Sequence, residues 1–208
     1  MPNSINSQNQ SFYVQKEATF GVIPNTSGTA TVANSNACRI IKLTTNQDQP
    51  LIDRPDNLPT LDFTIGVGGR RNAQWDASMS IAGSGVAGTK PDCDPILEAL
   101  FGNPATVVAA TSVGYTPADT SPSLSMWNFR KPSTASQGVA FGSIVKSAKF
   151  ALGADVATME FIGESYWVID TDQFSTAATA AKGGLTAFPA EPSAPVTNGT
   201  MVIGFTGS

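Results

Sequence analysis

Residues 61–81 read LDFTIGVGGRRNAQWDASMSI, and this stretch decides the fold class. Apolar residues occupy every second position from Leu61 to Val67 and again from Ala73 to Ile81. A period of two is typical of strands with one buried face. The glycines and arginines at 68–71 supply turn residues between the two stretches. The pattern predicts antiparallel strands joined as a hairpin or a bent ribbon.

Other stretches rich in β-branched and aromatic residues, bounded by turn residues, predict further strands. They cover 12–14, 37–45, 106–115, 124–130, 144–152, 156–164, 166–169 and 200–206. Gly153, Ala154 and Asp155 are expected to form a tight turn between two of these strands.

One short helix is predicted from Pro95 to Phe101. Asp94 would cap its start with Pro95 in the first turn, and Gly102 followed by Pro104 would end it. Its apolar residues share one face at helical spacing: Ile96, Leu97, Leu100 and Phe101. Such a face needs cover, so the helix is expected to lie against a sheet. The residues therefore predict an all-β domain with one flanking helix.

A long inter-strand loop is predicted from Thr45 to Thr60, a segment that contains three prolines. Long ordered loops usually contact something, and a contact loop and a solvent-exposed excursion fit this segment equally well. Stretches rich in Pro, Gly, Ser, Thr and Asn at 21–36, 116–122 and 183–198 are expected to be loops and extended arms. We expect one domain, 1–208, with an N-terminal arm and a C-terminal strand.

The composition is that of a globular chain of 208 residues, 41% of them hydrophobic. No apolar run is long enough to cross a bilayer, and the polar start lacks the features of a signal peptide, so we expect synthesis in a cytoplasm. Only 13% of the residues are charged, against roughly a quarter in ordinary soluble proteins. Either the surface is polar without charge, or copies of the chain cover part of it.

The absence of histidine excludes most familiar enzyme chemistry, since nucleophile pairs and general bases usually depend on it. Cys38 and Cys93 are too few for a zinc site and are expected to be buried and inert. A net charge of -4 argues against binding to nucleic acid, which favours a basic face. We therefore expect no catalytic residues, no cofactor and no metal.

Three motifs match the sequence patterns of chemical sites but lack the structural context that those sites need. Residues 83–88, GSGVAG, match a dinucleotide-binding turn, but the helix that should follow starts only near Pro95. Residues 143–146, SIVK, match a serine–lysine motif that needs a helix, whereas this segment predicts a strand. Asp92 and Asp94 could suggest a cation site, but capping of the helix already accounts for Asp94.

Three further stretches form a pattern through their order and spacing: KEATFGVIP at 16–24, GTKPDCDPILEALFG at 88–102 and MVIGFTG at 201–207. Together they resemble the tail tube (major tail) protein of bacteriophages with long, flexible tails. The first is similar to that family's N-terminal pattern, the second to its helix after a long hairpin, and the third to its final strand.

The resemblance implies an antiparallel β-sandwich or partial barrel whose copies form hexameric rings. The rings would stack into a hollow tube through which the genome leaves the virion. The implied location is the virion tail, assembled in the host cytoplasm, with no membrane. The implied partners are other copies of the chain, the tape measure protein, the tail terminator and distal tail proteins, with genomic DNA passing through without specific binding.

Two sets of site residues follow. Residues in and beside the long loop are predicted to contact a neighbouring subunit or ring: Asp48, Asp53, Arg54, Asp56, Arg70 and Arg71. Glu160 and Glu164 are predicted to face the lumen, because alternation sends the apolar residues of 156–164 to the core. From Asp155 onward the chain has six acidic residues and one basic residue, which suits a lumen that should not hold DNA. An ordinary solvated face is the alternative.

Two other functions remain open. Another virion β-sandwich, such as a tail terminator or a decoration protein, would share this composition but stop at one ring or a surface trimer. A carbohydrate-binding module or adhesin would need an exposed platform, for which the candidates are Trp75, Trp127, Trp167 and Tyr166. Trp75 lies on the apolar side of its strand, which favours a place in the core.

Overall fold

A computed structural model describes residues 10–26, 29–30, 32, 34–52, 67–69, 71–130, 136–152 and 157–171. The strands are β1 Gln10–Lys16, β2 Asn25–Thr26, β3 Thr29–Ala30, β4 Ala37–Cys38, β5 Lys42–Asp48, β6 Leu51–Ile52, β7 Val67–Gly68, β8 Asn72–Ser80, β9 Thr106–Val108, β10 Ser112–Gly114, β11 Leu124–Arg130, β12 Ser136–Leu152, β13 Ala157–Ser165 and β14 Trp167–Thr171. The helices are α1 Asp94–Phe101 and a 3-10 turn, η1 Asn34–Asn36. No helix in the described part is long and apolar enough to span a membrane.

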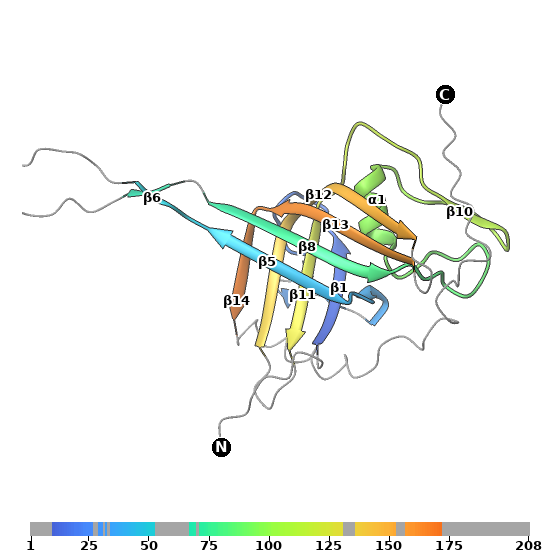
Figure 1. Ribbon diagram of the computed structural model, residues 1–208, viewed down its shortest axis with the longest axis horizontal. Helices are drawn as coiled ribbons and strands as arrows, with labels where there is room; N and C mark the ends of the chain where they lie inside the picture. The colour runs from blue at the N-terminus through green and yellow to red at the C-terminus, as the bar shows by residue number, and fades with distance from the viewer. Residues whose placement is uncertain are drawn as a thin grey trace, which may run out of the picture.

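Eight strands form one antiparallel sheet in the order β4-β1-β11-β12-β13-β8-β5, with β14 paired to β12 beside this path. The 17-residue strand β12 belongs to both halves of the sheet. Figure 1 shows β1, β11 and β14 running across the direction of β5 and β8. The sheet is thus curled into a half-barrel, and the expected all-β partial barrel with one helix is confirmed.

The sheet turns its corner at Gly142 in β12. This residue has φ of +59°, and a Cβ there would lie 2.7 Å from the Cβ of Tyr166. Glycine adopts this left-handed conformation without the steric cost that a side chain adds. The strand pairing also shifts between Val145 and Ser147, and such bulges bend strands. The bend lets one strand serve two layers that cross at a large angle.

The core fills the inside of the curl. Its main cluster includes Trp75, Met79, Ile96 and Phe161, and α1 closes it by lying against β12, β1 and β11. A smaller cluster surrounds Trp127. The helix begins one residue earlier than predicted, at Asp94, and ends where predicted; Leu97 and Leu100 pack against the main cluster while partly exposed.

Replacing Leu100 by Ala should lower the free energy of unfolding by about 2 kcal/mol, near the low end for a leucine because the side chain is only partly buried. The melting temperature should fall by about 4 to 8 °C. Val86→Ala is the matched control, because Val86 is exposed and its truncation should leave the melting curve almost unchanged. Equal melting of both variants and the wild type would contradict the placement of α1.

Two expectations about the region before β8 are wrong within the described residues. β8 does not pair with the preceding stretch: it pairs with β5 and β13, while β7 pairs with β6. The expected loop from Thr45 begins as strand, since residues 45–48 belong to β5 and β6 follows. Polar strands at a sheet edge carry little apolar alternation, which is why this one resembled a loop. Residues 53–66 and 200–206 lie outside the described residues.

Candidate assembly surfaces

The first surface is the open side of the sheet at β5. This strand ends the order of the sheet, and no described strand pairs with its outer edge. All its side chains are exposed or only partly buried, and most are polar. A seven-residue edge of this kind offers a row of free backbone groups to another chain.

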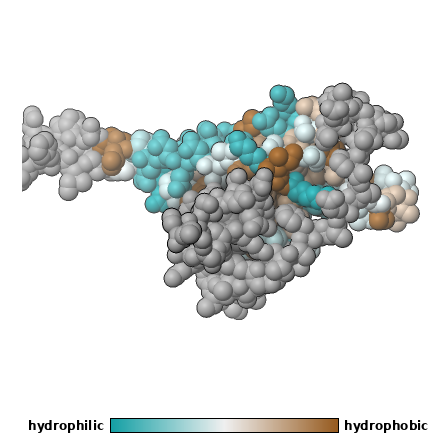
Figure 2. Space-filling model, turned by 60° about the horizontal axis from the view of Figure 1, so that its bottom comes forward, coloured by the Kyte–Doolittle hydropathy of each residue, from teal (hydrophilic) through white to brown (hydrophobic). Residues whose placement is uncertain are grey.

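A ribbon continues from β5 and β8 away from the body of the molecule through β6 and β7 (Figure 1). Leu51 and Ile52 in β6 are both exposed. Figure 2 shows brown at this end of the ribbon, next to the teal of polar residues nearer the body. An apolar segment held away from the core is typical of a contact with another molecule.

Of the six predicted contact residues, the structure describes Asp48 and Arg71; Asp53, Arg54, Asp56 and Arg70 lie outside the described residues. Asp48 is exposed in β5 and is the register partner of Asn72. The guanidinium of Arg71 lies 4.6 Å from the centre of the Trp167 ring. Both residues are therefore at the base of the ribbon.

The second surface is the outer face of β12, β13, β8 and β5. The burial of β13 alternates as predicted, with Met159 and Phe161 buried and Glu160 and Ile162 exposed. Glu164 is on the outer face and forms an ion pair with Lys146. Glu160 is the register partner of Lys149.

Charges on this outer face nearly cancel. Residues paired across strands share a face, so register gives its charged members. They are three lysines and four acids: Lys42, Lys146, Lys149, Asp48, Asp76, Glu160 and Glu164. The sum is -1, and the other positions are mostly Ser, Thr, Asn and Gln. The face is polar and almost neutral, without the acidic excess expected from the composition of the C-terminal part.

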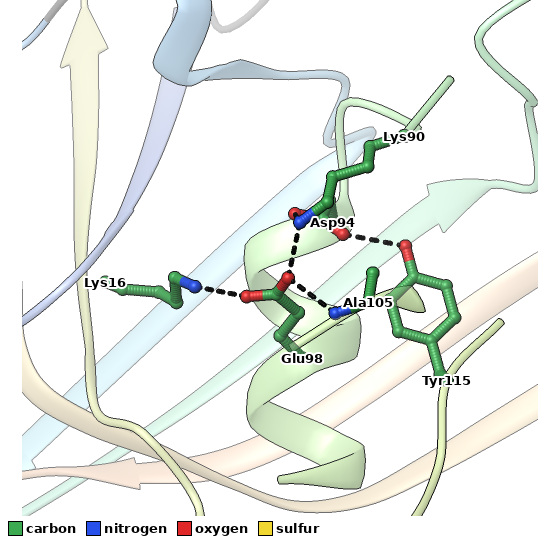
Figure 3. Close-up of polar contacts among 6 residues, drawn as sticks. All are labelled: Lys16, Lys90, Asp94, Glu98, Ala105 and Tyr115. Atoms are coloured by element: carbon green, nitrogen blue, oxygen red, sulfur yellow. Dashed lines mark hydrogen bonds and ion pairs between the residues drawn. The ribbon is translucent and has the colours of Figure 1, made fainter. Parts of the chain in front are cut away.

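The third feature is a network of charges around α1 that holds the β9–β10 hairpin (Figure 3). Glu98, only 1% exposed, pairs with Lys16, and its Oε1 accepts hydrogen bonds from Lys90 Nζ at 2.6 Å and from the Ala105 backbone N–H at 2.9 Å. Asp94 accepts bonds from Lys90 at 3.1 Å and from the Tyr115 hydroxyl at 2.9 Å. Ala105 and Tyr115 flank the hairpin, so both of its ends are fixed to the helix.

The predicted capping by Asp94 is wrong. The N-cap residue is Cys93, without a side-chain cap bond, and Asp94 uses its carboxylate for Lys90 and Tyr115 instead. Lys90, Asp94 and Glu98 are spaced four apart, a signal that could have indicated the network from the sequence. Lys16 is too distant along the chain for any such signal.

Acid should destabilise the protein by protonating Glu98. The variant Glu98→Gln separates this effect from the titration of the other carboxylates. Burial alone would raise the pKa of Glu98, but the hydrogen bonds from Lys16, Lys90 and Ala105 outweigh it and lower the pKa to about 2. The stabilisation is therefore complete above the ordinary pKa of 4.5 and is lost as the pH falls toward 2. Between pH 5 and pH 2 the wild type should lose about 2 kcal/mol more than Glu98→Gln in urea titrations. Parallel losses would contradict this account.

A second buried carboxylate, that of Glu17, connects several elements, and the sequence patterns did not indicate this role. Glu17 accepts four hydrogen bonds, from the backbone N–H groups of Gly21 and Gly142 and from the hydroxyls of Ser123 and Ser125, at 2.6 to 2.8 Å. Each bond satisfies a group that would otherwise be costly to bury. Glu17 thus ties its own loop and β11 to the corner of β12, which gives a physical reason for the acidic residue and glycine in the KEATFG segment.

The motifs that resembled chemical sites have ordinary structural places. Gly83, Gly85 and Gly88 lie in a loop before α1, and Lys90 is paired with acids of the helix. Ser143 is buried against Ser165. Cys38 and Cys93 are free and buried as expected, and burial raises the pKa of Cys93 to about 12. The described residues contain no group of three or more acidic, Cys or His side chains that could hold a metal ion.

Comparison with known proteins gives structural likeness only. No family model and no curated protein matches the sequence. A chain of the PVC sheath–tube complex, an extracellular contractile injection system in its extended state, aligns with a TM-score of 0.51 at 8% identity, over 82% of this chain and 93% of its own. The chain has the tail-tube fold.

Two other solved structures align less closely. One is the SPP1 tail tube, with a TM-score of 0.48 at 9% identity, over 85% of this chain and 84% of that one. The other is the tail of an empty GTA particle, with a TM-score of 0.42 at 11% identity, over 81% and 99%.

Proposed function

We propose that this chain is a structural protein that assembles into the tube of a phage-type tail. The observation that carries the proposal is the nearly neutral outer face of β12, β13, β8 and β5 beside the open edge of β5. An antiparallel sheet with a free edge can pair with the next copy, and ring closure then removes every edge. The tail-tube fold supports the same reading.

In this proposal six copies form a ring, and rings stack into a hollow tube in the virion tail, assembled in the host cytoplasm. The outer face of β13 lines the lumen with Glu160 and Glu164. A polar lining with a charge near zero offers no stretch of lysines or arginines to hold phosphates, so DNA passes without specific binding. The tape measure, terminator and distal tail proteins are the proposed partners at the tube's interior and ends.

The described contact residues of the proposal lie at the base of the ribbon. Asp48 and Arg71 belong to it in the described part. Asp53, Arg54, Asp56 and Arg70 stay predicted contacts to an adjacent subunit or ring.

A sugar-binding platform has less support. Trp75 and Trp127 are buried in the two core clusters, and Trp167 lies beneath Arg71. A single ring or surface trimer, as in a terminator or decoration protein, is the second candidate, because the same open edge would close such a ring.

Negative-stain images of the purified protein separate these functions. Hollow tubes of stacked rings are the expected result at high protein concentration. Single rings would favour a terminator, and persistent monomers under all assembly conditions would contradict a tube protein.

A further inference from the structure

The β9–β10 hairpin projects from one end of the molecule (Figure 1) and carries no charge. No charged residue occurs from 103 to 118, or from 82 to 89 in the loop beside it. Val107 and Val108 point to opposite faces of a two-stranded sheet, and they are 46% and 51% exposed. Val86 in the adjoining loop is 66% exposed. Figure 2 shows this end in brown and pale colours.

The hairpin is held firmly despite its exposure. Glu98 and Asp94 bond Ala105 and Tyr115 at its two ends, and the ring of Tyr115 stacks on Phe101 with centroids 5.9 Å apart. Gly88 touches the hairpin turn so closely that a Cβ would lie 2.5 Å from the backbone N of Ala110. An apolar surface that is already rigid loses little entropy on binding, and depletion of charge is typical of interface centres.

A groove of about 780 Å³ lies at the corner of the sheet, where Gly142 is part of its lining. Phe20 and Tyr166 form its apolar wall, with rings 6.4 Å apart in an edge-to-face arrangement, and both are more than half exposed. The rest of its lining consists of Arg71 and Asn72 at the start of β8 and of Gly142, Ile144, Glu164 and Ser165 in β12 and β13. Figure 1 places the start of β8 beside the ribbon, far along the long axis from the hairpin.

The two surfaces complement each other in shape and chemistry. The hairpin is convex and uncharged, and its two strands leave outer backbone groups without strand partners in the described sheet. The groove is concave, with two aromatic rings on one wall; Arg71 and Asn72 offer side-chain N–H donors, and Glu164, which is paired with Lys146, also belongs to its lining. Aromatic walls with polar rims are typical of pockets that hold the main contacts of an interface.

We propose that the β9–β10 hairpin of one copy docks into the Phe20–Tyr166 groove of a second copy. This inference rests on the proposed self-assembly and names a contact that would carry it. Because the two surfaces differ, the contact is head-to-tail and repeats from copy to copy. Head-to-tail contacts close into rings when the rotation between copies allows it.

A charge on the hairpin tests the contact. Val108→Asp should fold with an unchanged melting temperature, because its side chain is half exposed, yet fail to form the assemblies of the wild type. Val108→Thr, with nearly the same shape, and Thr120→Asp, which adds the same charge outside the hairpin, should assemble. Normal assembly of Val108→Asp would overturn the proposal. Failure of the wild type to assemble would instead overturn the proposed function.

Cross-linking tests whether the hairpin docks into the groove, independently of any effect on folding. Assemblies that carry Val108→Cys and Tyr166→Cys should give a ladder of covalent oligomers with a short bis-maleimide, while each single variant should not. Cys38 and Cys93 are buried and should not react. Val108→Cys with Lys149→Cys, on the outer sheet face, is the control pair. Tubes that give no ladder with the first pair, or an equal ladder with the control pair, would overturn the proposed docking of the hairpin into the groove.

Discussion

Replacing residues 50–70 by a short Asn-Gly turn should give a folded monomer that no longer forms tubes. β5 and β8 remain paired through Asp48 and Asn72, and Asn-Gly suits a tight turn between two such strands. The core lies inside the curl of the sheet, so the melting temperature should change by no more than a few degrees. Sedimentation and negative-stain images of wild type and variant measure the loss of assembly.

A milder variant serves as the control for this replacement. Leu51→Asn with Ile52→Thr keeps the length of the ribbon but removes its exposed apolar side chains. It should assemble less readily than the wild type and better than the shortened chain. Normal tubes from the shortened chain would show that the ribbon has no part in assembly.

Glu160→Lys combined with Glu164→Lys should give tails of normal length and a loss of infectivity of the order of tenfold or more. The described charges on the outer face change from three lysines and four acids to five lysines and two acids, from -1 to +3. A positive wall would attract DNA phosphates and slow passage through the tube. Infectivity assays and tail-length measurements on the same particles separate transport from assembly.

The matched control is Glu160→Gln with Glu164→Gln, which raises the sum only to +1 and creates no pair of lysines opposite Lys149 or Lys146. It should stay close to the wild type in infectivity. If both double variants lose infectivity equally, the ion pair between Lys146 and Glu164 matters for structure and the lumen account of these residues is wrong.

Local alternation predicted the strands that have one buried face. β8 and β13 lie within one or two residues of their predicted bounds because each carries its own period of two. The end of β5 was misplaced, since its sequence KLTTNQD contains one apolar residue and it pairs with β8, a strand that is distant in sequence. Strand partners in a curled sheet are distant in sequence, so a pairing based on neighbours failed for β7 and β8.

The charged residues inside the fold were the hardest to predict. Glu17 and Glu98 are buried because groups from distant elements converge on them: Gly142 and Ser125 on Glu17, and Lys16 on Glu98. The sequence pattern contained only the local part of each arrangement. Both acids lie in the stretches that resemble tail tube proteins, and the structure shows the hydrogen bonds that give them a role.

A helical reconstruction of assembled tubes from electron micrographs would show which face of the sheet lines the channel. We expect a hollow tube with the outer face of β12, β13, β8 and β5 toward the lumen and both Glu160 and Glu164 on its wall. The open edge of β5 should pair with, or be covered by, a neighbouring copy. A tube with Glu160 and Glu164 on its outer surface, or an assembly without a channel, would contradict the account.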